Sequence, residues 1–166
     1  MKRHLLILLC AAPLLAHAAD SPDKSFYKNL AEGGLAEVSD GTLAGEKATD
    51  PKLKDFGAIM VKDHSAANDK LSALAGTKGI TLPTTASVSE MAGHEKLKLL
   101  SGDTFDKSYI KGQISAHRST IRLLRKEIAS GQDSDAQAFA KSVLPTVQGH
   151  LKAIDAIATA DGVSTK

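Results

Sequence analysis

Apolar residues recur every three or four positions along most of this chain, which is the spacing of one face of an α-helix. Breaks rich in Gly, Pro, Ser and Asp separate these amphipathic stretches. No stretch of useful length alternates apolar and polar residues as a half-buried strand does. The pattern therefore predicts five helices, near residues 25–48, 51–77, 87–100, 104–129 and 135–160.

Four of the predicted helices are long, and consecutive helices are joined by short connections. Such helices pack side by side with their apolar faces inward. We therefore predict an all-α fold, an antiparallel four-helix bundle with an additional short helix at 87–100. The expected inward residues are Phe26, Leu30, Gly33 and Ala44 in the first helix; Leu53, Phe56, Met60, Ala67, Leu71 and Leu74 in the second; Asp106, Ile110, Ile114, Ile121, Leu124 and Ile128 in the fourth; and Phe139, Val143, Val147, Ile154 and Ile157 in the fifth.

One ionisable residue interrupts the apolar face of each long helix: Glu37, His64, His117 and His150. Each lies about 12 to 16 residues from the start of its helix, near the middle, and helices packed side by side bring their midpoints to one level. We therefore expect the four side chains to converge inside the bundle. Three imidazoles and one carboxylate are a donor set that suits a single zinc, copper or iron ion.

The same four residues have a second interpretation that needs no metal. Buried histidines and carboxyls are commonly satisfied by hydrogen bonds within a core, and a closed network of this kind fixes helix register. A di-iron oxidase site is not expected, because such bundles use Glu-x-x-His motifs. Here Val61, Ile114 and Val147 stand three positions before the histidines. A mononuclear site and a metal-free network remain.

Three further polar residues flank the candidate ligands. Asp63 points about 100° away from its neighbour His64, so it either orients a histidine of another helix or faces water. Asp106 and Tyr109 lie near the start of helix 104–129, where a carboxylate also stabilises the helix N-terminus. These three are candidate outer partners of the metal ligands.

The first 18 residues have the pattern of a secretory signal. Lys2 and Arg3 precede the apolar run 5–15, and the small residues of 16–18 form a cleavage signature. The run is too short for an ordinary transmembrane helix. Cys10 is disfavoured as a lipid-attachment site because the bulky Leu9 precedes it. We therefore expect four segments: a cleaved signal at 1–18, an extension at 19–24, one helical domain at 25–161 and a tail at 162–166.

Charge and composition exclude several classes of function. The full chain has 21 Lys and Arg against 19 Asp and Glu, so loss of Lys2 and Arg3 with the signal leaves no net charge. Nucleic acid is therefore not an expected partner. Removal of 1–18 also removes the single cysteine, and the rest shows no nucleophile-elbow or phosphate-binding motif. We expect no hydrolase, and no catalytic residue is assigned.

Several short motifs occur in an order that resembles a known family. They are Glu37, the run 60–64 that ends in Asp63 and His64, Ser101 and Gly102, Phe105 and Asp106, Tyr109, His117, Leu144 and Pro145, and His150. Together they are similar to the domain of unknown function 4142 family, over residues 26–158. The resemblance implies a ferritin-like helical bundle and an exported, periplasmic location. It implies no established activity or cofactor, and shared fold does not establish ferroxidase activity.

The sequence thus predicts a periplasmic, non-enzymatic protein with a metal ion or small ligand bound at a central His and Glu cluster. A metal-free structural or envelope-stress protein, with a partner in the cell envelope, is the alternative. A redox enzyme with a mononuclear metal is a third hypothesis, which needs a bound redox metal and a vacant coordination position.

Overall fold

The computed structural model describes residues 23–164, which contain five α-helices and no strand. The expected all-helical fold is confirmed, and each helix begins and ends within two residues of its expected position. The predicted signal at 1–18 lies outside the described residues. The helices are α1 (Asp23–Lys47), α2 (Pro51–Thr77), α3 (Val88–Lys98), α4 (Gly102–Ser130) and α5 (Ser134–Ala160).

Capping residues fix where three of these helices begin. The Asp50 side chain accepts a hydrogen bond from the Lys52 amide, and Pro51 occupies the first turn of α2, where its missing N–H costs nothing. Ser87 and Glu90 form a reciprocal capping box at the start of α3. Asp133 accepts hydrogen bonds from the first amides of α5. The breaks seen in the sequence therefore act as helix start signals.

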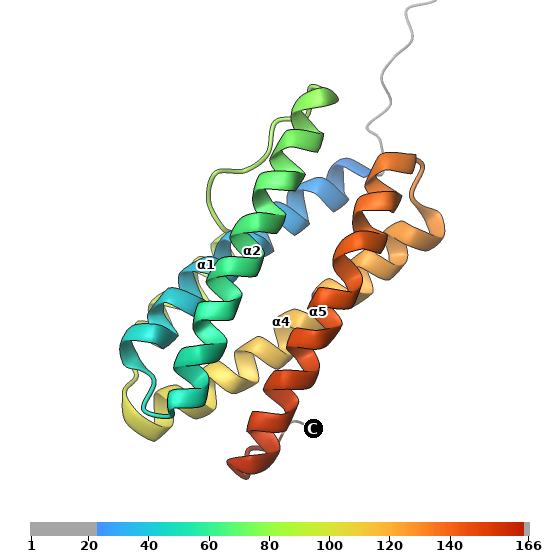
Figure 1. Ribbon diagram of the computed structural model, residues 1–166. Helices are drawn as coiled ribbons and strands as arrows, with labels where there is room; N and C mark the ends of the chain where they lie inside the picture. Colours follow the sequence, from blue (N-terminus) through green and yellow to red (C-terminus); the bar gives the residue numbers. More distant parts are fainter. Residues whose placement is uncertain (1–22, 165–166) are drawn as a thin grey trace, which may run out of the picture.

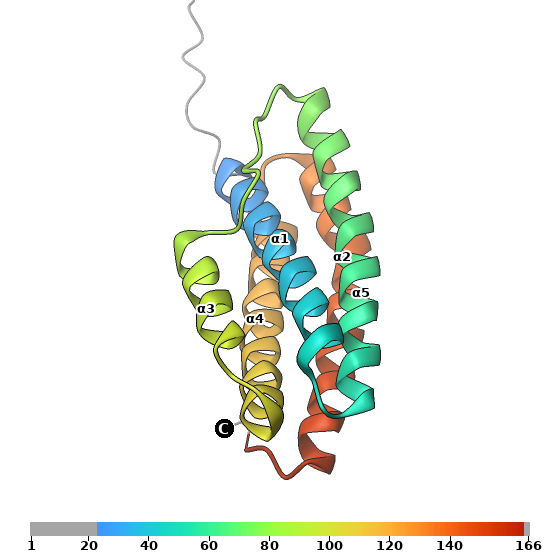
Figure 2. The same cartoon turned by 90° about the vertical axis from the view of Figure 1, so that its left-hand side faces the viewer.

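The four long helices form two side-by-side pairs, α1 with α2 and α4 with α5 (Figure 1). α1 also packs on α4, and α2 packs on α5, so each long helix has two long neighbours. The short helix α3 lies outside this group, against α1 and α4 (Figure 2). The described residues include no helix suited to crossing a lipid bilayer, because none combines sufficient length with sufficient apolar character.

Two glycines allow the backbones of α1 and α2 to touch. A Cβ atom on Gly41 would lie 2.7 Å from the carbonyl oxygen of Gly57, and one on Gly57 would lie 2.5 Å from the carbonyl oxygen of Gly41. Cβ atoms do not approach other atoms so closely. Any side chain at either position would therefore push the two helices apart.

Two apolar clusters fill the interior, one toward each end of the long helices. In α2, Phe56 and Met60 belong to the first cluster and Leu71 to the second, and His64 lies between them in the sequence. The other long helices repeat this order. A polar residue therefore separates the two clusters in each long helix: Glu37, His64, His117 and His150.

Some of the expected inward residues lie at the edge of the core. They are half-buried, and all but Gly33 and Ala67 pack against one of the two apolar clusters: Leu30, Gly33, Ala67, Leu74, Ile128, Phe139, Val143 and Ile157. In α1 and α5, smaller residues next to them in the helical projection are fully buried, because small side chains let neighbouring helices pack closely. The buried positions belong to Ala31 and Gly34 in α1 and to Ala136, Ala140 and Ala158 in α5.

Candidate metal centre

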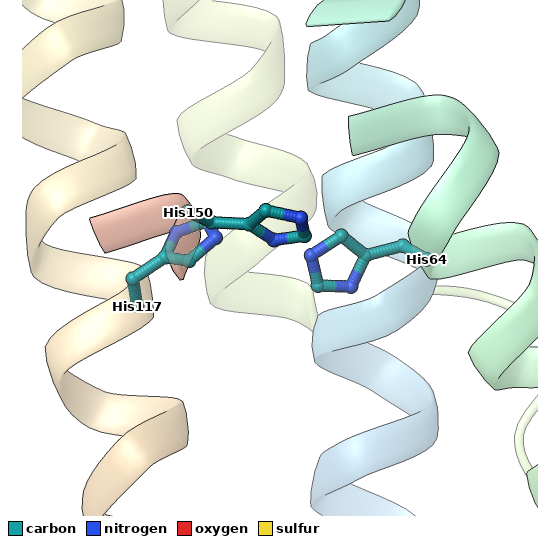
Figure 3. Close-up of side chains that lie close together, drawn as sticks. All are labelled: His64, His117 and His150. Atoms are coloured by element: carbon teal, nitrogen blue, oxygen red, sulfur yellow. The ribbon is translucent and has the colours of Figure 1, made fainter. Parts of the chain in front are cut away.

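Three histidines from three helices meet in the middle of the protein. His64 of α2, His117 of α4 and His150 of α5 are 8, 1 and 7% exposed. Figure 3 shows their rings gathered together, and each ring contributes one nitrogen to a set whose members all lie within 4.8 Å of one another. Among the described residues this is the only group of three or more His, Cys, Asp or Glu side chains with that geometry.

The hydrogen bond of His117 fixes which of its nitrogens is free. Nδ1 lies 2.9 Å from the backbone carbonyl oxygen of Gln113, one turn earlier in α4. A carbonyl oxygen only accepts, so Nδ1 must carry the hydrogen. Nε2 therefore has a bare lone pair in the neutral ring, and it is buried with no hydrogen-bond partner.

In His150 the hydrogen is on the other ring nitrogen, Nε2. Its Nε2 lies 3.0 Å from Oδ2 of Asp63, whose carboxylate accepts the N–H. Nδ1 of His150 then carries the lone pair, and this atom and Nε2 of His64 are also buried without partners. Each of the three histidines therefore has one unpaired ring nitrogen inside the protein.

Burial keeps two of these rings neutral. Loss of solvent lowers the pKa of His64 to about 3, helped by the nearby His117 and His150. Loss of solvent also lowers the pKa of His117 to about 4, although its bond to the Gln113 carbonyl opposes this. Neutral imidazole is the form that binds metal ions. Both side chains are thus in the metal-binding form at neutral pH.

Glu37 is not part of the group of three. Its Oε1 atom lies 3.6 Å from Nδ1 of His117, and its Oε2 atom accepts a hydrogen bond of 2.7 Å from the Gln113 side chain. Glu37 thus contacts the edge of His117 that carries the N–H, not the edge with the free nitrogen. Burial raises the pKa of Glu37 to about 8. Of the four predicted ligands, the structure brings together the histidines and places Glu37 behind one of them.

The three expected outer partners have different environments. Asp63 contacts a histidine of another helix, His150. Asp106 instead accepts hydrogen bonds from the amides of Thr49 and Asp50, so it holds the α1–α2 turn and lies about 16 Å along α4 from His117. Tyr109 stacks on Phe105. Burial and the charges of Glu37 and Asp40 raise its pKa, and its hydroxyl makes no hydrogen bond to any of the three histidines.

Two residues of this site were missed in the sequence. Gln113 is 2% exposed and bonds both Glu37 and His117. Its position, one turn before His117 on the apolar face of α4, was a signal that it is buried. Phe56 packs its ring 6.3 Å from His117 and 6.4 Å from His150, and so forms an apolar wall of the cluster. Nothing distinguished Phe56 from other core residues, because its partners come from two other helices.

Comparisons with known proteins place this geometry in context. The profile of the family described as "Domain of unknown function (DUF4142)" matches residues 10–157, which confirms the family expected from the sequence motifs. No curated protein sequence matches the chain significantly.

Two solved structures show the same fold. One is the crystal structure of "putative secreted protein DUF305" from Streptomyces coelicolor, with a TM-score of 0.75 and 12% identity over 90% of this chain and 98% of that one. The other is a DUF305 fragment from Deinococcus radiodurans, with a TM-score of 0.72 and 10% identity over 82% of this chain and 95% of that one. At such low identity the likeness concerns the fold alone.

Proposed function

Because the chain belongs to the family "Domain of unknown function (DUF4142)", whose name states no activity, we propose a function from its own residues: binding of one transition-metal ion by His64, His117 and His150. The observation that carries this proposal is the set of three buried, unpaired ring nitrogens, which lie close together. A buried polar atom without a partner costs about 1–3 kcal/mol. One metal ion would give all three nitrogens a partner.

The ligand atoms are Nε2 of His64, Nε2 of His117 and Nδ1 of His150. The outer partners support this choice, because ligating histidines usually donate their second N–H to a carboxylate or a backbone carbonyl. Asp63 and the Gln113 carbonyl have those roles here. Three imidazoles suit zinc, copper or iron, and a site with three protein ligands leaves a further position for water or a small ligand.

A metal-free hydrogen-bonded network has less support from this geometry. A closed network would use the ring nitrogens as donors and acceptors toward one another or toward neighbouring side chains. The described residues instead leave one nitrogen unpaired on each of the three rings. We therefore rank metal binding above a purely structural cluster.

The proposal includes the setting of the site. We classify the four long helices as an antiparallel four-helix bundle of ferritin-like type, with α3 as the additional short helix. We place the protein in the periplasm after removal of residues 1–18. The name of the Streptomyces coelicolor neighbour, which describes that protein as a candidate for secretion, supports export.

Titration of metal-free protein with zinc, copper and iron salts, followed by calorimetry, tests the proposal. We expect one ion bound per chain, with binding abolished in His64→Ala and in His150→Ala. The matched control is His94→Ala, because His94 lies on α3, where it contacts Asp40 outside the cluster. Circular dichroism verifies that each variant is folded. Absence of binding in the parent protein, or equal binding by all variants, would contradict the proposal.

A further inference from the structure

A separate cleft lies between α1, α3 and α4. Its volume is about 740 Å³, within the range of about 300–1,000 Å³ that small-molecule sites occupy. None of the three clustered histidines lines it. Small residues on all three helices leave this space open: Gly33, Ala36, Gly93, Gly112 and Ala116.

Two buried polar side chains lining this cleft have atoms without a partner. Tyr109 is 1% exposed and Gln113 is 2% exposed, and both line the cleft. The Tyr109 hydroxyl and Oε1 of Gln113 make no hydrogen bond. Leaving such atoms unpaired in a folded protein is costly, so they indicate a site where a polar ligand binds.

The charges of the cleft favour a positively charged ligand. Glu32, Asp40 and Glu90 line the cleft, against two lysines. One of these, Lys28, is already bonded to Glu32 at 2.7 Å. Glu37 also lines the cleft, but its raised pKa of about 8 leaves it mostly uncharged at neutral pH. Asp40 accepts a hydrogen bond of 2.6 Å from His94, and Glu90 accepts one of 2.8 Å from the Ser87 amide. Oε1 of Gln113 is also an acceptor. The cleft therefore offers several hydrogen-bond acceptors and one more negative than positive charge at neutral pH.

A bare metal ion does not fit this arrangement. No three of the carboxyls in the cleft belong to a group whose ligand atoms lie within 4.8 Å of one another, in the part of the chain that the structure describes. A larger cation with several N–H donors is long enough to donate to carboxyls of the cleft that lie far from one another. Leu97, Leu100 and Leu123 also line the cleft and provide apolar surface for a hydrocarbon chain.

We propose that this cleft binds a small aliphatic amine, with ammonium groups donating to Gln113 and to the carboxylates of Asp40 and Glu90. The methylene groups of the ligand pack against the leucines. This site is independent of the proposed metal centre, although both include contacts with Gln113.

The first test is calorimetric titration of metal-free protein with the diamine putrescine. Two probes of similar length serve as controls. Butanediol is uncharged, and succinate has the opposite charge. We expect saturable binding of one putrescine per chain and no binding of the other two. Absence of saturable putrescine binding, or equal binding of butanediol, would overturn the proposal.

The second test fills the cleft. A Cβ on Gly112 meets no atom within 4 Å, so Gly112→Leu can fold with its side chain in the cleft. Gly45→Leu is the matched control, since Gly45 is equally unobstructed and lies outside the cleft. We expect Gly112→Leu to weaken putrescine binding at least about tenfold and Gly45→Leu to leave it unchanged. Equal affinity of both variants would overturn the proposal.

A third comparison tests the charge and separates the two sites. Asp40→Asn should weaken putrescine binding, whereas Asp55→Asn, at an exposed position of α2 outside the cleft, should not. His64→Ala should bind putrescine as the parent does, because His64 does not line the cleft. Loss of putrescine binding in folded His64→Ala would contradict an independent amine site. If the protein binds putrescine but no metal ion, the proposed metal centre is contradicted and the amine site is not.

Discussion

Oδ2 of Asp63 lies 3.0 Å from Nε2 of His150, so a carboxylate on α2 determines the tautomer of a histidine on α5. The same contact joins the two helix pairs at the level of the candidate metal centre. With Nε2 protonated, the lone pair of His150 is on Nδ1, the ring nitrogen that is buried without a partner.

Replacing Asp63 by Ala should therefore weaken metal binding without abolishing it. Loss of an outer partner of a ligating histidine typically costs about 10–100-fold in metal affinity. Competition with a chelator of known affinity measures the change. Asp55→Asn, an exposed substitution on the same helix, should bind metal as the parent does. Unchanged affinity in Asp63→Ala would mean that His150 is not a ligand through Nδ1.

His64 and His117 should lower the stability of the metal-free protein as the pH falls below about 6.5, whereas Glu37 and Glu127, whose pKa values burial raises to about 8 and about 7, should raise it over the same range. The folded-state pKa values of His64 and His117 are about 3 and about 4, because both rings are buried. The unfolded chain therefore binds protons in this range that the folded chain does not. Each histidine lowers the free energy of unfolding by up to about 1.4 kcal/mol per pH unit until its folded-state pKa is reached.

Urea unfolding at about pH 7 and about pH 5 measures this effect in the parent and in His64→Gln. Relative to its value at about pH 7, the free energy of unfolding at about pH 5 should be higher in the variant than in the parent, because the variant has one buried histidine fewer. Glu37 and Glu127, whose raised pKa values act in the opposite direction, are common to both proteins and do not affect the difference. An identical change in the free energy of unfolding in both proteins would show that His64 is not held neutral by burial.

Much of this arrangement was accessible from the sequence, because helix boundaries and midpoints follow from spacing and capping residues. The central positions of Glu37, His64, His117 and His150 were predicted in this way. The orientation of Glu37 behind His117 was not, because helical projection gives the face of a residue and not the atoms it meets on another helix.

The hydrogen bonds of Asp106 to the α1–α2 turn could likewise not be predicted from the residue pattern of one helix. Its partners, the amides of Thr49 and Asp50, lie more than 50 positions away in the sequence and offer no motif of their own. The close approach of α1 and α2 at Gly41 and Gly57 also depends on two separate helices. Isolated glycines in a helical pattern suggest such contacts, but one sequence does not pair them.

Asp106→Ala should destabilise the fold and leave the metal centre intact. The carboxylate accepts hydrogen bonds from two backbone amides in the α1–α2 turn, and their loss costs about 1–3 kcal/mol. Chemical denaturation measures the stability, and metal titration of the folded variant measures the site. A loss of metal affinity without a loss of stability would assign Asp106 to the metal centre after all.

Gly57→Ala should destabilise the protein by about 1–3 kcal/mol, since its Cβ would collide with the backbone of α1. Gly45→Ala is the control. A Cβ at that position meets no atom within 4 Å, so the exchange should raise stability by about 0.5–1 kcal/mol through helix propensity. Thermal unfolding of both variants provides the comparison, and equal effects would disprove the close approach of α1 and α2.

The most direct measurement is a crystal structure of the zinc-loaded protein with anomalous data at the zinc edge. Binding by the three histidines predicts one anomalous peak, about 2.0–2.1 Å from Nε2 of His64, Nε2 of His117 and Nδ1 of His150. Asp63 and the Gln113 carbonyl should keep their hydrogen bonds to the rings. A peak at other residues, or none at the cluster in crystals that contain zinc, would contradict the metal centre.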